Sequence, residues 1–128
     1  MTLKKIKNVW YCDDKRVPDQ CVRVVRLCNL LTECIDLNID RLDIMCHLLR
    51  AYKQLGVDVE KGRVQLRDVC GYLVLVEGLM EKCSAYISLN LKRFPKHLIK
   101  FMDNKGFILD VLEPELRGGY FLDYRKGV

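Results

Sequence analysis

Seven cysteines and two histidines are the residues of this 128-residue chain that could support the widest range of chemistry. Thiolates and imidazoles bind metal ions, and structural zinc usually draws on cysteine pairs at C-x₂₋₄-C spacing. No such pair occurs here. The nearest approaches are Cys28 with Cys34 and the adjacent Cys46 and His47. We therefore expect neither a metal centre nor a cofactor.

Most of the cysteines fall instead on the apolar sides of expected helices, where free cysteine behaves as a small buried hydrophobe. Their odd number argues against a secreted disulfide framework, and the basic N-terminus lacks the apolar run of a signal peptide. We expect reduced thiols in an intracellular protein of the cytoplasm or nucleus. The cysteines are Cys12, Cys21, Cys28, Cys34, Cys46, Cys70 and Cys83.

Nucleophilic catalysis would require an activated cysteine or serine beside a base and an oxyanion pocket. His47 is expected on the outer side of its helix, between Asp43 and Arg50, and His97 lies in a basic segment. Neither histidine belongs to a known catalytic signature, and no phosphate-binding glycine motif is present. The sequence therefore favours a protein that is not an enzyme.

The composition, 50% apolar and 30% charged residues, is typical of a globular chain of one domain. We expect a mainly α fold, a bundle of about four helices, over residues 1–128. A basic strip (residues 1–17) would precede the helical bundle (residues 18–104). A tail (residues 105–128) would be irregular or form a β-hairpin.

The first two helices are predicted from apolar residues that recur every three or four positions. The first would cover residues 19–36, with Pro18 at its start. The second would cover about residues 41–55, with Asp40 as its N-cap and Gly56 as its C-terminal stop.

A third, long helix is expected over about residues 64–89, although the segment CGYLVLV within it could also form a strand. The helical period continues on both sides of that segment, and strands rarely exceed ten residues. Glu77 interrupts the apolar run far short of the ~20 residues that span a bilayer, so no membrane span is expected. A short, basic fourth helix would start at Pro95 and end before Gly106.

The third predicted helix carries a second line of small and apolar residues opposite its main apolar side. Glycine inside a helix costs up to about 1 kcal/mol relative to alanine, so two glycines on one line indicate a close approach by another segment. That segment would be either the rest of the same bundle or a second subunit or partner helix. The predicted partner interface comprises Gly71, Val74, Leu75, Gly78, Lys82 and Ala85.

A basic run with no acidic residue extends from residue 82 to residue 102, and Phe94 and Phe101 are interleaved with its cations. Such a run can follow phosphates and stack bases, although a solvated basic surface has the same composition. A short helix would also bury the two phenylalanines. The candidate nucleic-acid residues are Lys92, Arg93, Lys96, His97 and Lys100.

From these patterns we expect a small adaptor or regulatory protein without catalytic activity. It would bind another protein, or a second copy of itself, through a helix face. The alternative is a regulatory or accessory protein, such as a viral accessory factor, that binds RNA or DNA through the basic run.

Overall fold

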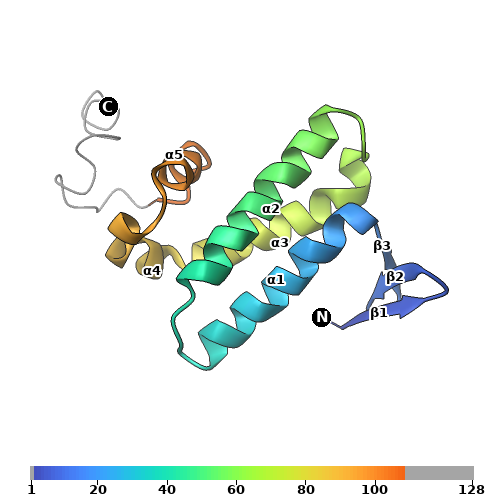
Figure 1. The fold of residues 1–128 in the computed structure, drawn as a ribbon, viewed down its shortest axis with the longest axis horizontal. Helices are drawn as coiled ribbons and strands as arrows, with labels where there is room; N and C mark the ends of the chain where they lie inside the picture. The colour runs from blue at the N-terminus through green and yellow to red at the C-terminus, as the bar shows by residue number, and fades with distance from the viewer. Residues whose placement is uncertain (1, 109–128) are drawn as a thin grey trace. The chain divides into compact units, whose positions relative to one another are not determined.

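The computed structural model describes residues 2–108 of the chain. This range divides into two compact units, one ending at Leu79 and the other beginning at Met80. The expectation of a mainly helical fold is confirmed, but the described range contains five α-helices and an N-terminal sheet. The elements are β1 (Leu3–Ile6), β2 (Val9–Cys12), β3 (Lys15–Val17), α1 (Asp19–Asp36), α2 (Leu42–Glu60), α3 (Leu66–Lys82), α4 (Ser84–Leu89), the 3₁₀ helix η1 (Leu91–Arg93) and α5 (Lys96–Asn104) (Figure 1).

Residues 3–17 form an antiparallel sheet of order β1-β2-β3, where we expected a basic strip. Two-residue turns connect the strands at Lys7–Asn8 and Asp13–Asp14, and all four turn residues have φ values between 49° and 70°. This is the pattern of type I′ hairpin turns, in which Asn and Asp tolerate the left-handed backbone. The strands escaped prediction because each has only three or four residues, too few for a clear alternation of apolar and polar positions.

The sheet is joined to the first helix through Trp10. The charged group of Arg26 in α1 lies 4.7 Å from the centre of a Trp10 ring, and that of Lys5 in β1 lies 5.6 Å from it. Cys12 and Val17, which share this face of the sheet, are buried. The face that carries Trp10 therefore contributes to the core of the first unit.

Helix α1 covers the predicted residues 19–36, and its predicted apolar side is buried except for the half-buried Ile35. Helix α2 differs from the prediction at both ends. Its N-cap is Arg41, whose backbone N–H donates to Asp40 Oδ1 (3.0 Å), and Asp40 does not cap the helix. Gly56 lies inside α2, which continues to Glu60.

The actual stop of α2 is Gly62, whose φ of +73° closes a Schellman motif. The backbone N–H of Arg63 donates to the carbonyl of Asp58 (2.9 Å), and that of Gly62 donates to the carbonyl of Val59 (3.1 Å). The Asp58 side chain fastens the same turn, because its Oδ1 accepts bonds from Arg63 Nη1 (2.9 Å) and Gln54 Nε2 (3.0 Å). These contacts carry the helix past Gly56.

The long helix expected over residues 64–89 is two helices, because the chain leaves helical geometry at Cys83. The backbone of Cys83 has φ −92° and ψ 11°, away from helical values near −63° and −42°. No glycine or proline marks this break in the sequence. The strand alternative for CGYLVLV is wrong, since residues 70–76 lie within α3.

The short basic helix near residue 95 is confirmed as α5, which begins after Pro95 and ends at Asn104, two residues before Gly106, where φ is +78°. No helix within residues 2–108 is both long and apolar enough to cross a membrane. Of the tail expected over residues 105–128, residues 109–128 lie outside the described range.

Candidate functional site

One side of α3 is exposed and mixes apolar with charged residues, because the exposed Arg67 lies between Val74 and Gly78 around the helix axis. Val74 is 63% exposed and Leu66, at the edge of this side, is 55% exposed. We call this surface the outer face of α3. Its small and apolar members are Leu66, Cys70, Gly71, Val74, Leu75 and Gly78, of which all but the half-buried Leu75 are exposed.

The two glycines of the outer face have open space where a side chain would stand. A Cβ atom added at Gly71 or at Gly78 would meet no atom within 4 Å. Neither glycine has a positive φ, so neither is required by the backbone conformation. Within the first unit, therefore, no segment makes the close approach that the glycines would permit.

The opposite side of α3 holds the helix in the first unit and so determines which side faces outward. Val69 and Val76 are fully buried there. At the edge of this side, the Tyr52 hydroxyl of α2 donates to Glu77 Oε2 (2.6 Å). Burial raises the pKa of Tyr52, and the bond to Glu77 raises it further, so the phenol stays protonated as a donor. This contact links α2 to α3.

The structure brings together only part of the predicted partner interface. Gly71, Val74, Leu75 and Gly78 lie on one uninterrupted helix within the first unit. Lys82 is the exposed last residue of α3. Ala85 is exposed on α4, beyond the break at Cys83, so the helical repeat that aligned it with the glycines ends before it.

Two members of the outer face were missed from the sequence. They are Leu66 and Cys70, which are exposed but do not belong to the predicted partner interface. The signal that could have found them is their spacing, since residues 66, 70 and 74 follow one another at four-residue steps, which places them on one side of a helix.

The remaining six cysteines are buried, and none of the seven is part of a disulfide bond. Burial raises the pKa of Cys21 and of Cys28 to about 12, so both are protonated at neutral pH. Thiolates, not thiols, are the nucleophiles and metal ligands. Among the described residues, no three Cys, His, Asp or Glu side chains form a group that could hold a metal ion.

All five candidate nucleic-acid residues are exposed in the second unit, on η1 and α5. The hypothesis that the aromatic residues of the run stack on bases does not hold for Phe94, because its side chain is only 4% exposed. Phe101 is half-buried, and the Lys105 ammonium lies 5.8 Å from the centre of its ring. The cations therefore reach solvent without an exposed aromatic ring beside them.

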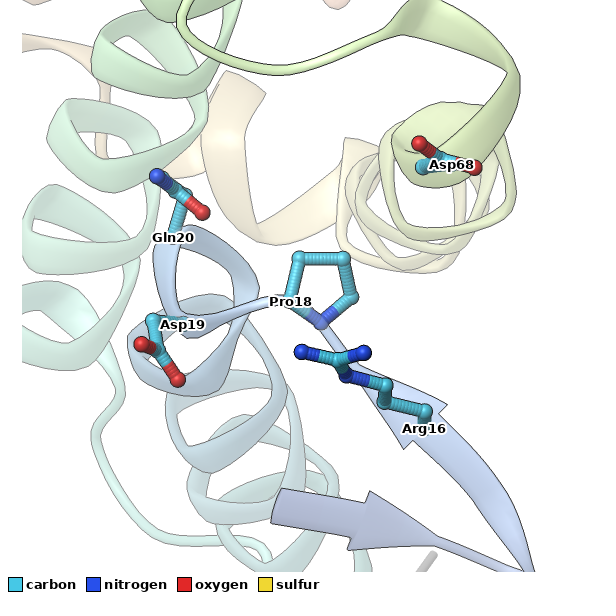
Figure 2. A pocket seen from close by; sticks show the side chains of 5 residues that line it. All are labelled: Arg16, Pro18, Asp19, Gln20 and Asp68. Atoms are coloured by element: carbon cyan, nitrogen blue, oxygen red, sulfur yellow. The ribbon is translucent and has the colours of Figure 1, made fainter. Parts of the chain in front are cut away.

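A hollow of about 500 Å³ lies at the starts of α1 and α3 in the first unit. Figure 2 shows the Arg16 guanidinium of β3 beside Pro18, with Asp19 and Gln20 from α1 and Asp68 from α3 around it. These side chains combine one cation with two carboxylates and one amide, and they include no cysteine, serine or histidine.

Comparisons with known protein families, with characterised proteins and with solved structures found no match to this chain.

Proposed function

We propose that this protein is a non-catalytic interaction module that binds another protein, or a second copy of itself, through the outer face of α3. The observation that carries the proposal is the open space at Gly71 and Gly78 beside the exposed Val74. Gly71 and Gly78 make α3 less stable than alanines would, and no segment of the first unit packs on them. A second chain that packs on this surface would provide the compensating contact. An adaptor or regulatory role would use such a face.

The energetics of the outer face favour a bound state. Burying an aliphatic side chain such as that of Val74 contributes about 1.5–3 kcal/mol, and the exposed Leu66 would add a comparable amount. Glycine lets the backbone of a partner helix come close, so that these side chains can be covered together. The outer face would thus supply the apolar centre of an interface.

The proposal is tested by Gly78→Gln with Gly56→Gln as its matched control. Both glycines lie inside helices of the first unit, and neither has an atom within 4 Å of an added Cβ. Glutamine favours helix over glycine at either position. We expect Gly78→Gln to weaken association in analytical ultracentrifugation, or capture of a partner, while Gly56→Gln leaves both unchanged. Equal effects of the two substitutions would contradict the proposal.

Cys70 provides a second readout, because it is the one exposed cysteine of the seven and lies on the outer face. Self-association should slow the reaction of Cys70 with a thiol reagent as protein concentration rises, and Gly78→Gln should remove this protection. A reaction rate that is independent of concentration, together with a monomer in ultracentrifugation, would exclude self-association. A partner of different sequence would then be the remaining form of the proposal, with capture as its test.

We also propose an intracellular location. The seven cysteines include no disulfide, and free thiols persist in reducing compartments. Labelling of Cys70 in intact cells that make the protein, compared with the purified reduced protein, measures whether this thiol stays reduced there.

A further inference from the structure

The second unit has exposed basic residues on its last two described helical segments, η1 and α5. We call these residues the basic face, and every member is exposed. Lys96 and Lys100 are one turn apart on α5, so their side chains project in nearly the same direction. The basic face comprises Lys92, Arg93, Lys96, His97 and Lys100.

No acidic side chain of η1 or α5 offsets these charges at the surface. The sequence contains no aspartate or glutamate from residue 82 to residue 102, and Asp103, the one carboxylate of α5, is only 8% exposed. Between residues 80 and 108 the chain has six lysines and arginines against two acids. Residues 80–108 therefore carry a net positive charge.

The position of Lys96 does not stabilise α5. Lys96 lies in its first turn, where no acidic residue is present. The N-terminus of a helix is the positive end of its dipole, where a cation is unfavourable by about 0.3–1 kcal/mol. A bound anion would reverse this unfavourable interaction.

The apolar side of α5 is already buried, since Leu98, Ile99 and Met102 are inaccessible or nearly so. A helix that lies in a membrane surface needs its apolar side open to the lipid. The basic face therefore offers positive charge to a partner, but α5 has no exposed apolar side that could insert into lipid. An anionic bilayer is for this reason a poor partner for it.

We infer that the basic face binds the phosphate backbone of nucleic acid, a function beyond the proposed protein interaction of α3. A nucleic-acid strand presents regularly repeated negative charges, and lysine and arginine neutralise them. Arg93 Nη1 donates to Asn90 Oδ1 (3.0 Å), which orients a planar group suited to phosphate. With Phe94 buried, binding should depend on the backbone and be independent of base sequence.

The test measures binding of the full chain to a short fluorescent DNA duplex by anisotropy at several salt concentrations. Four lysine and arginine contacts predict a slope of log K against log salt of about −3.6. The double variant Lys96→Gln/Lys100→Gln should reduce the magnitude of the slope by about 1.8. Lys4→Gln/Lys15→Gln, on exposed lysines of β1 and β3, removes the same net charge and should leave the slope unchanged.

Three outcomes would overturn the inference. They are the absence of binding at low salt, equal losses in the two double variants, and displacement of the duplex by polyglutamate as effectively as by unlabelled DNA. The last outcome would assign the basic face to an acidic protein. Gly78→Gln should leave DNA binding intact, so that this inference and the proposed function of α3 succeed or fail separately.

Discussion

Replacing Gly71 and Gly78 by alanine should stabilise the folded monomer. Each glycine lies inside α3, and an added Cβ meets no atom within 4 Å, so neither methyl group causes a clash. Alanine in place of glycine inside a helix contributes about 0.5–1 kcal/mol through the lower backbone entropy of the unfolded chain. The sites are about 10 Å apart along the helix axis, so the double variant should gain about 1–2 kcal/mol.

Urea denaturation followed by circular dichroism, at a protein concentration low enough to keep the chain monomeric, measures this gain. The midpoint should rise with little change in slope. Gly62→Ala is the matched control, since Gly62 also has open space around its Cβ position but has a φ of +73°. Alanine there should destabilise by about 1 kcal/mol because of backbone strain. Destabilisation by the Gly71 and Gly78 substitutions would show that the outer face of α3 is covered in the monomer, and would refute the reasoning.

Three further predictions concern the packing of the described residues. Arg26→Ala should lower the free energy of unfolding by about 0.5–1 kcal/mol and change the fluorescence of Trp10, the only tryptophan, because the cation over its ring is lost. Hydrogen bonds from Arg63 and Gln54 lower the pKa of Asp58 in the folded protein. The ionised carboxylate therefore stabilises the fold above the ordinary aspartate pKa, and this stabilisation is lost as the pH falls toward the lowered pKa of the folded state. Arg63→Ala should reduce that acid-induced loss in urea titrations over a pH series, and an unchanged loss would assign it to other groups. Finally, a thiol reagent should modify one cysteine per native chain, Cys70, as shown by mass spectrometry, with the other six reacting after unfolding.

The helices with the clearest apolar period were predictable from the sequence because that period is a local property of the chain. Residues 19–36 repeat at helical spacing on one side, and α1 has those bounds. The end of α2 was not predictable in the same way. Gly56 and Gly62 are equally plausible stops by residue type, and the contacts of Asp58 with Gln54 and Arg63 decide between them.

The sheet and the break after α3 were beyond local patterns for different reasons. The turns at Lys7–Asn8 and Asp13–Asp14 lack the glycine that usually marks a two-residue hairpin, and the strands are too short to show a period. At Cys83 the chain leaves the helix without a glycine or proline.

The sequence by itself determined that Gly71 and Gly78 share one side of a helix, because seven residues complete almost two turns. It also determined that five basic residues follow one another without an acid between them. Only the tertiary structure decided which sides face outward. The period of apolar residues shows that α3 has two sides able to make contacts, but the burial of Val69 and Val76 against other segments leaves the glycines open. In the same way, Phe94 is buried although the basic residues next to it in the sequence are exposed. An apolar ring is more stable out of water, and a charged group is more stable in water.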